Sequence, residues 1–255
     1  MKKYISDLLW FEIKNEIPEK KAGPGRPEYD NRKTFEGILY VLDCAIPWSM
    51  MPIEFGNYKT IHGKYMRWQR SGMFYRLFNR AKRYYHNKKG FKNWFAFDTT
   101  SKKAPFASFG GKNPTDRARN GIKYAVMVDR RGAPMQADIF PANVHDSKTF
   151  LGALKKMKKS KKVRIIAADS AFDSKLLRSA SKEKNFALIA STNVRRKKGS
   201  HKYYAPCRYI IEQFFGILSW FRGIKTCWAK TKESALGFLH LACTLRIYRL
   251  AGILR

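Results

Sequence analysis

The chain has 255 residues, of which 52 are Lys or Arg and 19 are Asp or Glu, so its formal net charge is +33. A surplus of this size favours a polyanionic partner, with nucleic acid as the leading candidate and an anionic membrane surface as the alternative. Hydrophobic residues make up 44% and aromatic residues 15% of the sequence, which excludes a disordered basic tail.

Local patterns argue against a membrane protein and a zinc protein. The most apolar segment, 235–254, carries His240, Arg246 and Arg249, so we interpret it as an amphipathic core helix rather than a membrane span. The four cysteines are scattered without a CxxC pair, a pattern typical of reduced thiols. The sequence therefore predicts a cytoplasmic protein.

Residues 1–89 lack strand alternation and are predicted to form an all-α, helix-turn-helix-like domain that binds DNA. The predicted helices cover residues 6–17, 31–45, 58–71 and 73–86. The helix 58–71 carries Lys59, Lys64 and Arg67 at spacings that keep much of their charge on exposed faces. This pattern favours a recognition helix in the major groove, and the alternative is a solvated basic face on a packing helix.

From residue 90 the pattern changes to that of a mixed α/β domain, which we place at 90–255. The predicted strands cover residues 94–98, 123–129, 134–140, 163–169 and 186–190. Predicted helices lie at 147–157, 174–184, 208–224 and 235–254. The order of three strands, helix, strand, helix, strand and two helices predicts a mixed sheet flanked by helices.

Three acids stand where a solvated surface charge is not expected. Asp98 and Asp169 are each predicted to end a buried strand, and Glu212 lies beside the apolar stripe of the helix 208–224. Carboxylates that converge without partners repel and raise one another's pKa values. Divalent cations such as Mg²⁺ relieve this repulsion with oxygen ligands, and a pair of them is the usual machinery for displacement at phosphorus.

Other accounts of these acids stay open. For any one of the three taken alone, an ion pair with a lysine is the simpler account. Asp173 competes with Asp169 but is better interpreted as a helix N-cap, and Asp138 lies in an alternating strand where it can point to solvent. The three acids together, in this order of elements, favour a metal site.

The acids lie in the segments FDTT, IIAADSAFDS and RYIIEQFFGILSWFRGI. These segments resemble the signatures of bacterial insertion-sequence DDE transposases. Further sequence segments, from about Leu8 to the carboxy terminus, resemble transposases of the short single-frame kind in the insertion-sequence group numbered five. The resemblance implies a ribonuclease-H-like catalytic domain that cuts at insertion-sequence ends and joins the 3′ hydroxyls to target DNA. It also implies two Mg²⁺ or Mn²⁺ ions, double-stranded DNA as partner, a homodimer on DNA and a nucleoid-associated location.

Carried over position by position, the resemblance makes Asp98, Asp169 and Glu212 the catalytic residues and metal ligands. Arg208 matches the arginine of a related Tyr–Arg–Glu–Lys signature and is expected to bind DNA. The chain departs from this signature at the tyrosine and lysine positions.

The tyrosine position of that signature holds Ala205, and the lysine position holds Ser219. Arg222, about one turn after Ser219, has a basic side chain that we expect to contact DNA. Which side chains grip the terminal phosphates is therefore left open by the sequence.

Further contacts are predicted outside the signature. Lys112, Arg117 and Lys123 are placed in a loop after the first catalytic strand and are expected to hold the DNA end. Trp220 and Trp228 are interpreted as core residues, with stacking on an unpaired base as the alternative. Two other functions stay open: a hydrolytic nuclease of the same fold, and a DNA-binding regulator derived from a transposase.

Overall fold

The computed structural model describes residues 5–19, 28–90, 93–191 and 209–254. Its centre is a six-stranded sheet made of β1 (Trp94–Lys103), β2 (Gly111–Lys112), β3 (Asn120–Asp129), β4 (Pro134–Pro141), β5 (Arg164–Ala168) and β6 (Phe186–Ala190). The helices longer than one turn are α1 (Asp7–Lys14), α2 (Asn31–Cys44), α3 (Tyr58–Arg70), α4 (Met73–Lys89), α5 (Asp146–Lys156), α6 (Lys175–Glu183), α7 (Tyr209–Leu218) and α9 (Lys232–Leu250). Short helical turns are α8 (Arg222–Lys225), η1 (Trp48–Met50), η2 (Ile53–Phe55) and η3 (Ser170–Phe172).

The strands have the order β4-β3-β1-β5-β6, with β2 also paired to β3. β3 is antiparallel to both β1 and β4, whereas β5 is parallel to β1 and to β6. An antiparallel three-strand unit extended by two parallel strands is the ribonuclease-H-like arrangement. The predicted fold class is therefore confirmed.

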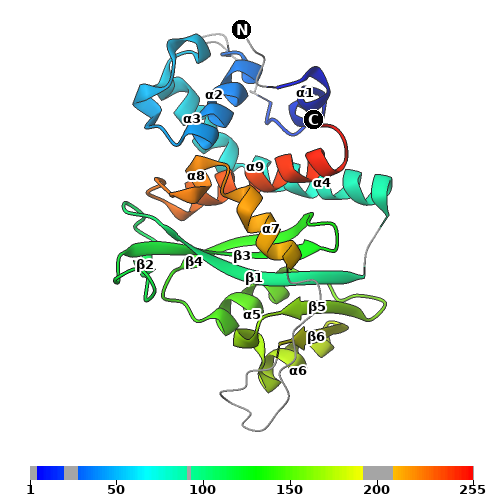
Figure 1. Ribbon diagram of the computed structural model, residues 1–255. Coiled ribbons are helices and arrows are strands. Elements are labelled where there is room, and N and C mark those ends of the chain that lie inside the picture. The colour runs from blue at the N-terminus through cyan, green and yellow to red at the C-terminus, as the bar shows by residue number, and fades with distance from the viewer. Residues whose placement is uncertain (1–4, 20–27, 91–92, 192–208, 255) are drawn as a thin grey trace.

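Helices cover both faces of the sheet (Figure 1). On one face, α5 and α6 pack over a core that includes Phe97, Phe150 and Leu177. On the other face, α4, α7 and α9 pack over a core that includes Val126 and Ile211. Figure 1 shows α7 crossing above β1 on this second face.

The amino-terminal helices do not form a separate core. Residues of α2, α3 and α4 belong to the same buried cluster as the face of the sheet under α9. Tyr65 of α3 stacks on Phe238 of α9 at 4.8 Å between ring centroids, and its hydroxyl donates to the Ser234 carbonyl. α4 lies along α9 in Figure 1. A functional division near residue 89 stays a prediction, and the two parts share one core.

Several local expectations are corrected by the structure. β1 does not end at Asp98 but continues to Lys103, because its polar second half pairs with β3. Asp173 is not the N-cap of α6, because Ser174 holds that position, and the Asp173 carboxylate pairs with Arg178 at 2.8 Å. Asp138 is buried and pairs with Lys156 at 2.5 Å rather than facing solvent.

The two tryptophans interpreted as core residues are exposed instead. Trp220 has 72% and Trp228 has 49% of its surface accessible. Trp220 follows the end of α7 and Trp228 packs on Phe106 at 5.7 Å between ring centroids. Trp220 lies between α7 and α8, and Trp228 lies between α8 and α9, so neither belongs to the apolar face of a helix.

Candidate active site and nucleic-acid interface

Asp98 and Asp169 are brought side by side by the parallel pairing of β1 and β5. The last paired position is Ala96 with Ala167. Each aspartate lies two residues beyond this pair, so the register places Asp98 next to Asp169. β5 ends at Ala168 while β1 continues, which opens the edge of β1 where the two carboxylates lie.

Both aspartates lie on the face of the sheet that α7 covers. Side chains alternate between the two faces of a strand. On β1, Phe97 belongs to the core under α5 and α6, whereas Ala96 belongs to the core under α7 and α9, so Asp98 shares the α7 side. On β5, Ala168 belongs to the core under α5 and α6, so Asp169, whose backbone is still extended, also faces α7.

Local hydrogen bonds fix the orientation of the two carboxylates. Asp98 Oδ1 accepts from the backbone N–H of Thr99 at 2.7 Å, and Asp169 Oδ1 accepts from that of Ser170 at 2.6 Å. Both aspartates are partly buried. Their geometry is therefore set by the strands and the turn that carry them.

Helix α7 places Glu212 above the same part of β1. Near its start, Ile210 packs against Gly132 in the turn between β3 and β4, and Asp129, just before this turn, pairs with Phe95 near the start of β1. Just past its end, Ser219 accepts a hydrogen bond at 3.0 Å from Lys102, near the end of β1. Glu212 lies between these two anchors, as Asp98 does on the strand below.

The side chain of Glu212 is exposed, whereas its neighbour Ile211 is fully buried. Among the described residues, no three His, Cys, Asp or Glu side chains lie close enough together to hold a metal ion. The structure therefore brings the two aspartates together but does not draw Glu212 into one ligand group with them.

The pair of aspartates still fits a magnesium site by its donor chemistry. Mg²⁺ in phosphate-processing sites is usually held by one or two carboxylates, with waters and substrate phosphates completing its octahedron. Asp98 and Asp169 supply two carboxylates at an open strand edge. A third ligand on α7 is compatible with this arrangement.

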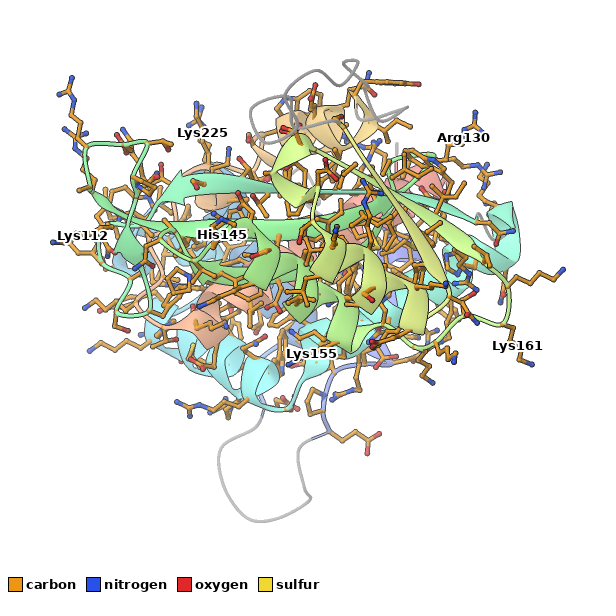
Figure 2. The ribbon with its side chains drawn as sticks, turned by 90° about the horizontal axis from the view of Figure 1, so that it is seen from below. Lys112, Arg130, His145, Lys155, Lys161 and Lys225 are labelled. Atoms are coloured by element: carbon orange, nitrogen blue, oxygen red, sulfur yellow. The ribbon has the colours of Figure 1, made fainter. Side chains whose placement is uncertain are left out.

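The predicted DNA-contacting residues are distributed over several surfaces. Lys59, Arg67, Lys112, Arg117 and Arg222 are exposed, in α3, β2, the turn after β2 and α8. Figure 2 shows Lys112 at the end of the molecule opposite Arg130. Arg208 lies outside the described residues.

Lys64 does not lie on the exposed face of α3, contrary to expectation. Its side chain is 3% exposed, and its ammonium donates to the Tyr29 carbonyl at 2.6 Å and to Asn31 Oδ1 at 2.5 Å. Glu28 lies 3.1 Å from the same ammonium. Lys64 therefore ties α3 to the segment before α2, and the sequence misplaced it because the partners lie more than thirty residues away.

This placement predicts different effects for two lysines of one helix. Lys64→Met is expected to lower the free energy of unfolding by about 1–3 kcal/mol, because the Tyr29 carbonyl and the Asn31 amide lose a charged donor. The DNA affinity of Lys64→Met should keep the wild-type dependence on salt.

Lys59→Gln, in contrast, is expected to leave stability unchanged and to reduce the salt slope of DNA binding by about one. Urea unfolding and binding titrations at several salt concentrations check both. Equal salt slopes for Lys59→Gln and the wild type would contradict a phosphate contact by α3.

Lys123 is also placed away from the aspartates. It pairs with Ser101 across β1 and β3, on the face opposite Asp98. Its ammonium donates to Asp146 Oδ1 at 2.7 Å and to the Val144 carbonyl at 2.9 Å. The structure therefore does not bring Lys123 to the candidate site.

Lys102 lies on the same face of β1 as Asp98 and was not among the residues predicted from the sequence. Its ammonium reaches Ser219, the residue at the lysine position of the related signature. Burial, and then the nearby charge of Lys225, lowers the pKa of Lys102 below its usual range. Only the polar run after Asp98 could have signalled this residue, and that run lies beyond the predicted strand 94–98.

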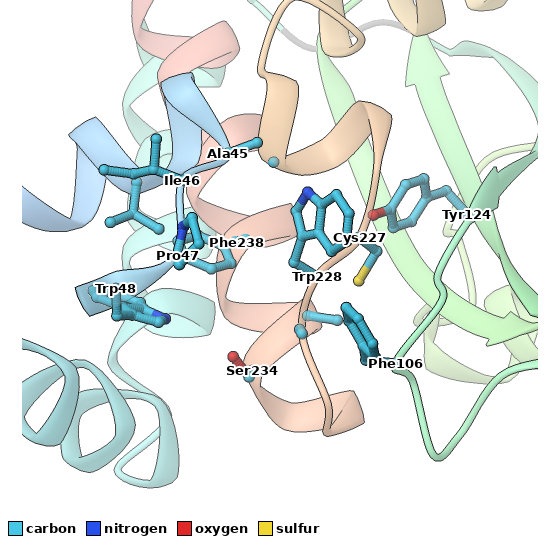
Figure 3. A pocket seen from close by; sticks show the side chains of 14 residues that line it. Ala45, Ile46, Pro47, Trp48, Phe106, Tyr124, Cys227, Trp228, Ser234 and Phe238 are labelled. Atoms are coloured by element: carbon cyan, nitrogen blue, oxygen red, sulfur yellow. The ribbon is translucent and has the colours of Figure 1, made fainter. Parts of the chain in front are cut away.

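An apolar cavity of about 380 Å³ lies elsewhere, between the amino-terminal helices and the segment after α8 (Figure 3). Trp48, Phe106, Trp228 and Phe238 contribute to its lining. None of the described residues that line this cavity is an Asp or Glu, so the cavity is not the candidate metal site.

The sheet defines the chain as a ribonuclease-H-like protein, and comparison with known families narrows that class. Residues 89–247, more than half of the chain, match the family described as "Transposase DDE domain". Residues 5–78 match the family described as "Putative transposase of IS4/5 family". The chain therefore belongs to the DDE transposase family. In the part of the chain that the structure describes, no helix is long and apolar enough to cross a bilayer.

Two curated relatives come from Burkholderia cepacia. The chain is 28% identical over 144 residues to a "Putative transposase for insertion sequence element IS402", a match that covers 53% of this chain and 66% of the relative. It is 34% identical over 82 residues to an "Insertion element IS402 uncharacterized 16.2 kDa protein", covering 30% of this chain and 56% of the relative. Less than two thirds of either relative is spanned.

Solved transposase structures resemble the chain only loosely. A piggyBac transposase synaptic complex with hairpin DNA is 12% identical, with a TM-score of 0.49, covering 98% of this chain and 76% of that one. The Mos1 transposase catalytic domain with raltegravir and Mg is 14% identical, with a TM-score of 0.29, covering 70% of this chain and 94% of that one. At such scores these likenesses add nothing to the family match.

Proposed function

We propose that the protein is a DNA transposase that cuts at insertion-sequence ends and joins the freed 3′ hydroxyls to target DNA. The observation that carries this proposal is the pairing of Asp98 with Asp169 at the open edge of β1, within a chain of the DDE transposase family. The large positive charge matches a double-stranded DNA substrate, and we place the protein in the bacterial cytoplasm, associated with the nucleoid.

Asp98, Asp169 and Glu212 are the residues that would hold two Mg²⁺ or Mn²⁺ ions. When bound, such ions stabilise the charge that develops on the phosphoryl oxygens and lower the pKa of the attacking water or hydroxyl. The chain's own part would be to fix the carboxylates: the strand register aligns the two aspartates, and α7 would supply Glu212 as the third ligand. DNA phosphates would be bound by exposed basic residues such as Lys112, Arg117 and Arg222.

We also propose a division of labour along the chain. Residues 1–89 would read the element ends through the exposed residues Lys59 and Arg67 of α3, and residues 90–255 would carry out the chemistry. An insertion sequence has two ends, so two copies of the chain would act together as a homodimer on DNA. Because both parts share one core, end recognition is better tested by substitutions in α3 than by cutting the chain at residue 89.

The proposed function is tested with a labelled element end, a supercoiled target plasmid and purified protein. We expect strand breaks and joined product in Mg²⁺ or Mn²⁺, and neither in EDTA. Ca²⁺, which is larger and less strict in its coordination, should support binding with little chemistry. Breaks without joining would identify a nuclease, and specific binding without breaks in any metal would identify a regulator.

A further inference from the structure

Lys102 lies on the catalytic side of β1, four residues after Asp98. At about 3.3 Å per residue, its backbone is about 13 Å further along the strand. Its ammonium donates to Ser219 Oγ at 3.0 Å, and the Ser219 hydroxyl donates in turn to the Phe215 carbonyl at 2.8 Å. The half-buried lysine is thus held in place by a neutral hydroxyl at the end of the helix that carries Glu212.

A second lysine is held beside the first. The segment after α8 continues the sheet at the end of β1, where Lys103 pairs with Thr226 and the Cys227 N–H donates to the Lys103 carbonyl at 2.9 Å. This pairing fixes Lys225 near Lys102, and the charge of Lys225 acts on the Lys102 ammonium. Figure 2 shows Lys225 at the same end of the molecule as Lys112.

The two ammonium groups repel each other, and no carboxylate in the described part of the chain forms an ion pair with Lys102. Bringing like charges together beside a partly buried site costs free energy unless an anion lies between them. Elsewhere, the well-buried Lys64 has an acidic partner within the chain. The pair at the end of β1 is therefore built for an anion that comes from outside.

We propose that Lys102 and Lys225 form a binding site for one phosphate of the DNA backbone. The proposal rests on the proposed function for the identity of the ligand, since the site lies on the face that holds Asp98 and Asp169. A distance of about 13 Å corresponds to at most about four nucleotides at 3.4 Å per nucleotide along a duplex. The bound phosphate therefore lies within about four nucleotides of the scissile phosphate. Binding it sets the position of the DNA end relative to the carboxylates.

The test measures DNA binding in EDTA, so that no cleavage interferes. The probe is a short duplex from the DNA that flanks the reading frame, titrated at several salt concentrations. Lys102→Gln is expected to weaken binding about tenfold, as loss of one charged contact implies. It should also reduce the slope of log affinity against log salt by about 0.9, the value for one phosphate.

Two variants separate a phosphate contact from other effects. Lys161→Gln makes the same change of charge at the opposite end of the molecule (Figure 2) and should leave the slope at its wild-type value. Ser219→Ala releases the Lys102 ammonium without removing a charge, so its slope should also stay near wild type. If Ser219→Ala or Lys161→Gln reproduced the slope of Lys102→Gln, the proposal would be overturned.

A scan of single methylphosphonates along the probe locates the phosphate. One neutral substitution should weaken wild-type binding yet have no further effect on Lys102→Gln, and Lys102→Arg should restore the sensitivity. A scan that is identical for the wild type and Lys102→Gln would overturn the proposal. Wild-type protein that binds with this pattern but never cuts DNA would contradict the transposase function and leave the phosphate site standing.

Discussion

Asp98→Asn and Asp169→Asn are each expected to abolish strand cleavage at element ends, with a loss of about 10³-fold or more. A bound metal ion contributes several kcal/mol to the stabilisation of charge at phosphorus, and each 1.36 kcal/mol corresponds to a factor of ten in rate. The amide keeps the shape of the carboxylate and its bond to the next backbone N–H, but it lacks the negative charge that holds a cation.

DNA affinity of both variants should equal or exceed that of the wild type, because removing a negative charge favours a polyanion. Single-turnover cleavage of a labelled end and a parallel binding titration measure the two quantities. Asp7→Asn is the matched control, since it removes one exposed carboxylate, paired with Arg32, and ion pairs at the surface contribute little. Wild-type cleavage by Asp169→Asn would show that this acid is not a ligand.

Glu212→Gln is expected to reduce cleavage by about 10²-fold or more, with stability and DNA affinity retained. Its side chain is exposed on α7 while its neighbour Ile211 is buried, so the substitution leaves the packing of the helix intact. The reason for the loss is that two ions held by two carboxylates alone would be short of protein ligands.

Glu183→Gln provides the comparison, because Glu183 is an exposed glutamate at the end of α6, on the other face of the sheet. It should cleave at the wild-type rate. Cleavage by Glu212→Gln within about threefold of Glu183→Gln would remove Glu212 from the catalytic set, since loss of a ligand should cost at least several-fold more. Thermal unfolding of both variants excludes misfolding as the cause.

The apolar strands and the helical stripes could be predicted because each has a local period. β5 and β6 are short apolar runs, and the stripe of α7 is carried by Ile211 and Phe214. The second half of β1 could not be predicted in this way. Its residues after Asp98 are polar, and only pairing with β3, a partner distant in sequence, makes them a strand.

The candidate site was predictable in part for the same reason. Two aspartates next to buried strands are a local signal, and parallel register then brings Asp98 and Asp169 together. The role of a lysine depends on what it meets in the fold. Lys64 is buried against Glu28 and Lys123 binds Asp146 on the far face, whereas Lys102, with no distinguishing pattern, reaches the end of the glutamate helix.

Anomalous X-ray scattering from Mn²⁺, in crystals of the protein bound to an element end, tests the site most directly. We expect a strong anomalous peak in contact with the carboxylates of both Asp98 and Asp169, and a second peak that shares one of them and contacts Glu212. The same crystals of Asp98→Asn should lose these peaks. Ordered DNA at this edge of β1 with no Mn²⁺ peak against either aspartate would contradict the metal-dependent site.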